Sequence, residues 1–157
     1  MENIHGQDLL KLSDDQLFQK VYLQTLDLLD SFPCEEDAFG EISPARRTFY
    51  IVSIFDMELQ NGGLCQFFVN SSKSVATGLV ACLSIVGAQA HLQLLKEFAS
   101  NNGIDLSSLD AFTITDIDDY LELLNQYDFA AFDDAFYKLP ALEELLVDYI
   151  KANIAEF

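Results

Sequence analysis

The 157-residue sequence is poor in basic side chains, with eight Lys and Arg against 26 Asp and Glu, so its formal net charge is −18. A protein that binds nucleic acid directly needs a basic face for the phosphates, and this charge argues against one. The same repulsion disfavours binding to an anionic membrane surface. We therefore expect no direct contact with nucleic acid and none with a membrane.

Cysteine and histidine are also scarce, with three and two residues. Cys34, Cys65 and Cys82 lack the close pairs typical of metal ribbons and redox motifs, so we expect reduced thiols in a cytoplasmic protein. His5 and His91 lie far apart in sequence, with no Cys or carboxylate at ligand spacing. We expect neither a metal site nor a cofactor.

Several organising signals are missing from the chain. No basic segment followed by an apolar one begins it, and no apolar run is long enough to span a bilayer. No repeat or Pro-rich linker divides it, and no run of β-branched residues alternates with polar ones. We predict an all-α fold, a compact bundle of about six to eight helices that forms one domain over residues 1–157.

Half of the residues are hydrophobic, and their spacing predicts the helices. Ser13–Gln16 has the form of a capping box, and the apolar stripe after it predicts a helix that ends near Phe32. Ser43 and Pro44 suit the N-cap and the first position of a second helix. Apolar residues lie on most sides of this helix, which predicts a central, largely buried position. Residues 34–41 are acidic and aperiodic, which predicts a loop. Further helices are predicted at 66–69, 74–85, 88–99, 116–126, 129–137 and 142–154.

The most distinctive segment is Glu58–Asn70, with the sequence ELQNGGLCQFFVN. Its two glycines predict a helix stop and restart, because glycine adopts the left-handed backbone that ends a helix. We expect the polar side chains to hydrogen-bond backbone groups at the junction, and the phenylalanines to anchor it in the core. We favour this structural role, with a small-molecule pocket using the same polar groups as the alternative. The motif residues are Glu58, Asn61, Gly62, Gly63, Gln66, Phe67, Phe68 and Asn70.

Catalytic and calcium-binding patterns are absent. The chain has no Gly-x-Ser-x-Gly elbow, P-loop or dinucleotide fingerprint, so we predict that it is not an enzyme. Asp116–Asp119 resembles the opening of a calcium loop, but Leu121 and Tyr127 occupy the sixth and twelfth positions, which need Gly and Glu. We instead expect these acids in the first turn of a helix capped by Thr115, where the helix dipole favours negative charge.

Negative charge is concentrated in the last part of the chain. Residues 97–157 contain 14 acidic and two basic side chains, whereas residues 1–96 contain twelve and six. Carboxylates three or four residues apart on a helix lie about 5 to 6 Å apart along its axis, close to the distance between neighbouring phosphates on a DNA strand. A merely solvated acidic face is the alternative. The carboxylates predicted to bind a partner are those of Asp116, Asp118, Asp119, Glu122, Asp128, Asp133, Asp134, Glu143, Glu144 and Asp148.

The pattern Glu-x-x-Asn-Gly-Gly-x-x-Gln-Phe-Phe-x-Asn at Glu58–Asn70 resembles the DNA mimic protein nineteen-like family, a helical domain-of-unknown-function family that includes a bacterial DNA mimic. Leu83–Ala88, Phe132–Tyr137 and Leu145–Asn153 are similar to it as well, so the resemblance covers residues 45–153. It implies an all-helical, non-enzymatic protein whose carboxylates replace phosphates and occupy the DNA-binding surface of a regulator.

The expected partner is therefore a basic protein, with a DNA-binding transcription regulator as the leading hypothesis. An immunity-type or antitoxin-like inhibitor that covers a basic toxin with the same acidic face is the alternative. Small-molecule binding at the Asn-Gly-Gly junction is the third hypothesis. The chain is expected to be a monomer or a homodimer.

Overall fold

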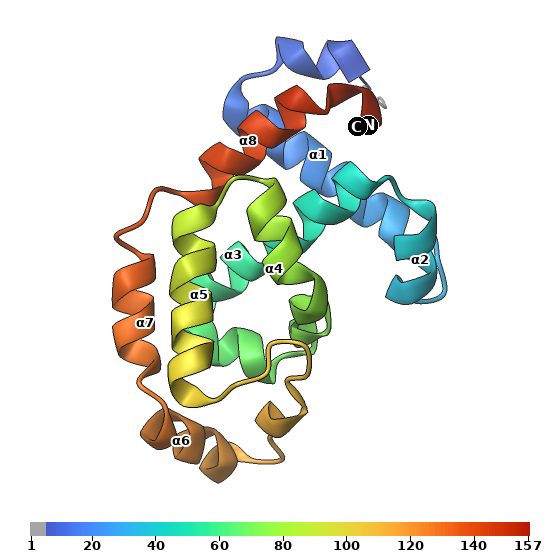
Figure 1. Cartoon of the computed structure of the whole chain (residues 1–157). Helices are drawn as coiled ribbons and strands as arrows, with labels where there is room; N and C mark the ends of the chain where they lie inside the picture. Colours follow the sequence, from blue (N-terminus) through green and yellow to red (C-terminus); the bar gives the residue numbers. More distant parts are fainter. Residues whose placement is uncertain (1–5) are drawn as a thin grey trace.

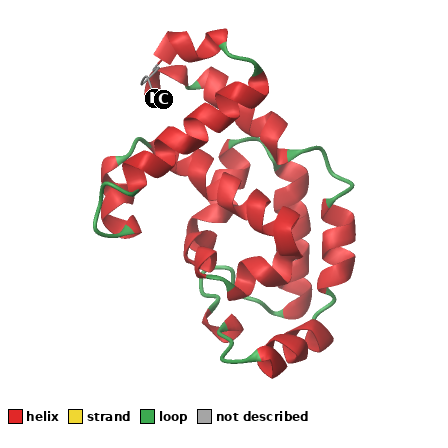
Figure 2. Cartoon of the chain, turned by 180° about the vertical axis from the view of Figure 1, so that it is seen from behind, coloured by secondary structure: helices red, strands yellow, loops and turns green. Residues whose placement is uncertain are grey.

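A computed structural model describes residues 6–157, apart from the side chains of residues 35 and 36. Within that range the chain forms helices and no strand, so the all-α prediction is confirmed (Figures 1 and 2). The α-helices are α1 (Asp14–Leu29), α2 (Glu35–Glu41), α3 (Pro44–Val69), α4 (Ala76–Ile85), α5 (Gln89–Asn102), α6 (Ile117–Gln126), α7 (Phe129–Phe136) and α8 (Leu142–Ala152). Short 3-10 helices are η1 (Gly6–Lys11), η2 (Ser71–Val75), η3 (Asp110–Phe112) and η4 (Ile154–Glu156).

The predicted starts of the first two long helices are confirmed. The Ser13 hydroxyl accepts a hydrogen bond from the Gln16 amide at 3.4 Å, and the Gln16 side chain accepts one from the Ser13 amide at 3.2 Å. These reciprocal bonds are the capping box of α1. Ser43 caps α3 by accepting from the Arg46 amide at 3.1 Å, with Pro44 as the first helical residue.

The loop predicted for residues 34–41 is wrong, because residues 35–41 form α2. Tertiary contacts stabilise this short helix, since Ala38 is fully buried and the Phe39 ring packs edge-on against Tyr50 at 5.9 Å. Cys34, the residue that precedes α2, makes no side-chain capping hydrogen bond. Seven residues are too few to show helical periodicity in the sequence, so no local pattern marked α2.

Helix α3 is the centre of the fold, as the apolar residues on most of its sides predicted. It packs against α4, α7 and α8, and Figure 1 shows it passing behind α4 and α5. Phe55, Phe67 and Phe68 on α3 are fully buried. The Phe68 ring lies 4.7 Å from the ring of Phe112 and 6.0 Å from that of Phe129, which ties α3 to η3 and α7.

Both ends of the described chain close over the N-terminal part of α3. The Gly6 amide donates to the Phe157 carbonyl at 3.2 Å, so η1 and η4 lie side by side (Figure 1). The Arg46 guanidinium lies 5.3 Å from the centre of the Phe157 ring and donates to the Thr25 hydroxyl at 3.3 Å. Burial lowers the pKa of this guanidinium. A buried cation on α3 therefore holds the last residue of the chain and α1 together.

The aromatic cluster around Phe68 predicts a large packing contribution to stability. Phe68→Ala should lower the free energy of unfolding by about 3 to 5 kcal/mol, because it opens a cavity among rings that cannot all collapse inward. Urea denaturation followed by circular dichroism measures this loss. Met57→Ala, at an exposed position on the same helix, is the matched control and should change stability by less than about 0.5 kcal/mol. Equal small losses would show that the Phe68 site is loosely packed.

Candidate functional site

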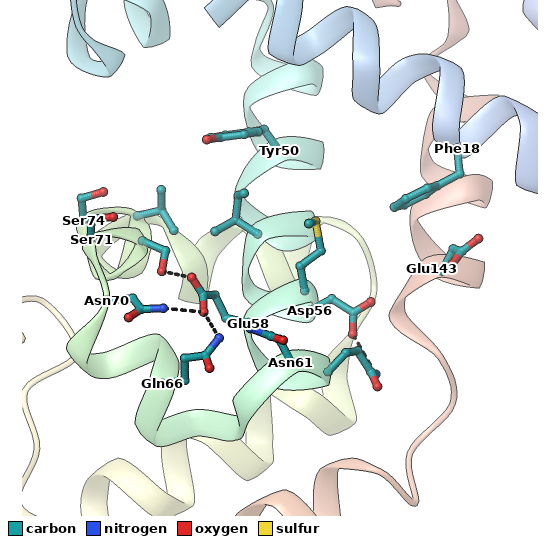
Figure 3. Close-up of a pocket in the computed structure, with 15 residues that line it drawn as sticks. Phe18, Tyr50, Asp56, Glu58, Asn61, Gln66, Asn70, Ser71, Ser74 and Glu143 are labelled. Atoms are coloured by element: carbon teal, nitrogen blue, oxygen red, sulfur yellow. Dashed lines mark hydrogen bonds between the residues drawn. The ribbon is translucent and has the colours of Figure 1, made fainter. Parts of the chain in front are cut away.

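Helix α3 is broken at Gly62 and Gly63, as the motif predicted. Gly62 has φ −156° and ψ 17°, and Gly63 has φ 76° and ψ −174°, so both leave the helical conformation. The left-handed residue is Gly63, where a side chain would strain the backbone. The second half of α3 therefore restarts in a new direction within one turn (Figure 3).

A single carboxylate, that of Glu58, connects the two sides of this break. It accepts hydrogen bonds from the Gln66 amide group at 2.7 Å, the Asn70 amide group at 2.9 Å and the Ser72 hydroxyl at 2.5 Å (Figure 3). Sequence reasoning expected Glu58, Gln66 and Asn70 to bond backbone groups, and in the structure they bond one another. Charge-assisted hydrogen bonds of this kind are about twice as strong as neutral ones, so Glu58 stabilises the bend.

Side chains of α7 and of the residue after it form hydrogen bonds with backbone groups at the break. The Asp133 carboxylate accepts from the Leu64 amide at 2.9 Å, and the Tyr137 hydroxyl donates to the Leu59 carbonyl. Without these partners, a buried amide and a buried carbonyl at the break would lose hydrogen bonds at a cost of about 1 to 3 kcal/mol each. Asp133, predicted as a partner-binding acid, therefore binds inside the protein.

A groove of about 1020 Å³ runs beside the broken helix (Figure 3). Glu58, Asn61, Gln66 and Asn70 of the motif line it, together with aromatic and aliphatic side chains of α1 and α3. Glu58, Gln66 and Asn70 are committed to one another, whereas Asn61 makes no side-chain hydrogen bond within the described part of the chain. Three of the four motif side chains in the groove are thus already hydrogen-bonded to one another.

Two further acidic side chains line this groove. Asp56 and Glu143 line it, and no Lys or Arg does. Burial raises the pKa of the Asp56 carboxyl, partly offset by the hydrogen bond from Gln60 at 3.4 Å. Asp56 and the buried His91 both line a smaller cavity of about 180 Å³. Burial lowers the pKa of the His91 imidazole. Sequence reasoning did not find Asp56, because one acid among 26 has no local signal.

The residue that caps the N-terminus of α6 differs from the predicted one. Asp116, not Thr115, caps the helix, accepting from the amides of Asp118 at 2.9 Å and Asp119 at 3.0 Å. The Asp119 carboxylate accepts from the Thr115 amide at 2.7 Å and from its hydroxyl at 2.8 Å. These bonds lower the pKa of Asp119. Asp118 and Glu122 are exposed and make no side-chain hydrogen bond among residues 6–157.

The remaining predicted acids fall on two separate surfaces. Asp128 caps α7 by accepting from the Ala131 amide at 3.1 Å, and Asp134 is exposed on the same helix. Figure 1 places α6 at one end of the molecule, α7 along the adjacent side and α8 near the opposite end. A second acidic hollow therefore lies far from α6. It is lined by Asp14 and Asp15 of α1 and by Glu143, Glu144 and Asp148 of α8.

Neither a metal site nor a single membrane-spanning helix emerges from residues 6–157. No group of three or more His, Cys, Asp or Glu in that range is arranged to hold a metal ion. His5, considered as a metal ligand in the sequence, lies outside the described residues. Among residues 6–157, α3 and residues 71–85 together have the length and hydropathy of a membrane span, but these two segments are bent by 75° to each other.

The fold and these surfaces define an all-α protein that is built on a broken central helix and carries a large excess of carboxylates. A model of the DMP19-like protein family matches residues 40–153, which include the whole motif. The chain belongs to this family, as the resemblance in the sequence indicated. Neither a curated protein nor a solved structure matches the chain.

The contact between Gly63 and Asp133 predicts a stability loss larger than backbone strain alone. A Cβ atom at Gly63 would lie 2.1 Å from an Asp133 carboxylate oxygen, whereas at Gly103, with φ 66°, nothing lies within 4 Å. Gly103→Ala should therefore cost only the left-handed strain, about 1 to 2 kcal/mol. Gly63→Ala should cost at least about 1 kcal/mol more, because ψ −174° places Gly63 in a backbone region essentially restricted to glycine and because the Leu64 amide loses its charged acceptor. Urea unfolding compares the two, and equal losses would show that this contact contributes nothing.

Asp56 and Asp133 predict a pH dependence of stability. Burial raises both carboxyl pKa values above 3.8, opposed at Asp133 by the hydrogen bond from Leu64. The native state therefore binds these protons more tightly than the unfolded chain, so the stabilisation is complete below 3.8 and is lost as the pH rises through the raised values. Thermal melting should show that Asp56→Asn flattens the stability curve above pH 3.8, relative to the wild type, because the carboxyl no longer titrates. An unchanged curve would exclude Asp56 as a contributor.

Proposed function

We propose that the chain is a non-enzymatic protein-interaction module, a DNA mimic whose carboxylates occupy the DNA-binding surface of a basic protein such as a transcription regulator. One observation carries the proposal: residues 97–137 contain ten acidic side chains and no Lys or Arg. None of these acids forms a salt bridge with another described residue. Apart from Asp133, which binds the Leu64 amide inside the protein, these acids are available to a basic partner.

The arrangement of these acids supports mimicry over mere solubility. Unpaired like charges on neighbouring helices repel one another and lower the stability of the fold. Solubility needs charge of either sign, spread over the surface, and a net charge far smaller than −18 meets that need. An excess of negative charge on α6 and α7 instead steers a positively charged surface towards this end of the molecule.

Two other hypotheses from the sequence stand beside this one. An immunity-type or antitoxin-like inhibitor uses the same acidic surface, and its partner is a basic toxin that DNA does not displace. Small-molecule binding in the groove has less support, because Glu58, Gln66 and Asn70 already satisfy one another there. We therefore place the partner on α6 and α7.

Capture from native cytoplasm at low salt, with identification by mass spectrometry, supplies the partner for the test. The variant neutralises Asp118, Glu122 and Asp134 (to Asn, Gln and Asn), which are exposed and make no side-chain hydrogen bond within residues 6–157. Affinity for the captured protein should fall at least about tenfold, mainly through slower association, because steering is lost. Salt should weaken wild-type binding steeply, since exposed charges are screened over about 8 to 10 Å. Surface plasmon resonance measures both effects.

The matched control neutralises three exposed acids elsewhere, Asp27, Asp37 and Glu41 of α1 and α2. It removes the same charge and should leave affinity nearly unchanged. Double-stranded DNA should compete with the wild type for a DNA-binding partner, whereas a partner that DNA cannot displace supports the inhibitor hypothesis. Equal losses in both variants would show a general charge effect, and binding indifferent to salt and to both variants would contradict mimicry.

A further inference from the structure

Helix α6 exposes an apolar stripe that the core does not use. Ile117, Leu121 and Leu124 are 66%, 49% and 42% exposed. At 100° per residue their spacing of four and three places them within an arc of about 60° on one face. No side chain of α6 is buried. These three apolar side chains are thus partly exposed to water, and their hydrophobic stabilisation is only partly gained when the chain folds.

The stripe lies between the face that attaches α6 to the protein and an acidic border. Tyr120 and Leu123 are partly buried and pack against the core, and at 100° per residue Tyr120 lies about 40° from Leu124, next to the stripe. The outer border of the stripe is acidic, because Asp118 and Glu122 follow Ile117 and Leu121 around the helix. One exposed surface therefore combines an apolar centre with a carboxylate border.

The apolar surface continues beyond the end of α6. A hollow of about 560 Å³ lies where α6 joins α7, and its lining mixes Leu124 and Tyr127 with the polar Asn125, Gln126 and Asp128. Leu124 belongs to both the stripe and the hollow. Ile117 and Leu124 are separated by about 10 Å along the helix axis, so the stripe and hollow together match two to three turns of an opposing helix.

Charge decides what covers this surface. A second copy of the chain would bring the same carboxylate border against this one, with no Lys or Arg between residues 97 and 137 to compensate. A purely cationic loop would leave the apolar centre uncovered. The complementary occupant has apolar residues at helical spacing and Lys or Arg beside them.

We propose that α6 is a docking helix for an amphipathic basic helix of the partner, whose apolar face covers Ile117, Leu121 and Leu124. Lysine or arginine side chains at its edge pair with Asp118 and Glu122. This inference rests on the proposed function and adds to it that the partner is held by an apolar contact as well as by charge. Such a contact slows dissociation and persists at salt concentrations that screen the carboxylates.

The test uses two synthetic peptides of about 18 residues, long enough to form a helix. One has Leu at positions i, i+4 and i+7 with Lys at the flanking positions, and the other has the same composition in scrambled order. Isothermal titration calorimetry at about 0.15 M salt should show that the whole chain binds the patterned peptide at least tenfold more tightly. Leu121→Gln with Leu124→Gln should abolish that preference, while the control Leu23→Gln with Leu28→Gln, at exposed positions of α1, should keep it.

The outcomes separate this inference from the proposed function. Equal binding of both peptides, weakened only by neutralising Asp118, Glu122 and Asp134, would overturn the docking helix and leave charge mimicry standing. Loss of the preference in the α1 control would overturn it as well. No binding of either peptide, together with no effect of neutralisation on the captured partner, would overturn the proposed function. Concentration-dependent dimerisation through the stripe, removed by the α6 substitutions in analytical ultracentrifugation, would assign it to a second copy and overturn the inference.

Discussion

The break in α3 is the constraint on which the rest of the structure depends. A buried helix that stops and restarts within one turn leaves an amide and a carbonyl without helical partners, and α7 supplies both through Asp133 and Tyr137. This fixes α7 against the centre of the fold. Because α6 immediately precedes α7 in the chain, the position of the exposed acidic helix follows from the hydrogen bonds between α7 and the break in α3.

The carboxylates consequently divide into two groups with different physical roles. Glu58 and Asp133 are partly buried and accept hydrogen bonds from amides and a hydroxyl of the protein, and they determine the direction of the chain. Asp118, Glu122 and Asp134 face water without an opposite charge beside them. Glu58 and Asp133 stabilise the bend in α3 and its contact with α7. The three exposed acids make the electrostatic field that we propose a basic partner recognises.

Local signals in the sequence accounted for much of the fold. The capping box at Ser13, the Ser43-Pro44 start and the glycine break were all predicted, because each is encoded within a few neighbouring residues. Helix α2 was missed because its stability comes from contacts with distant residues. Asp133 was assigned to the surface for the same reason, since its partner, Leu64, is 69 positions away in the chain. The exposed stripe on α6 had a visible pattern, but the pattern of an outward face is identical to that of a core face.

The most direct test of the account is hydrogen–deuterium exchange of the whole chain, free and bound to the protein captured from cytoplasm. We predict that binding slows amide exchange in residues 116–134, which contain α6 and most of α7, because a docked partner excludes water from these short, exposed helices. Exchange in the groove along residues 56–72 and in the first turns of α1 and α8 should be nearly unchanged. Protection confined to the groove, or to the acidic hollow between α1 and α8, would contradict the account.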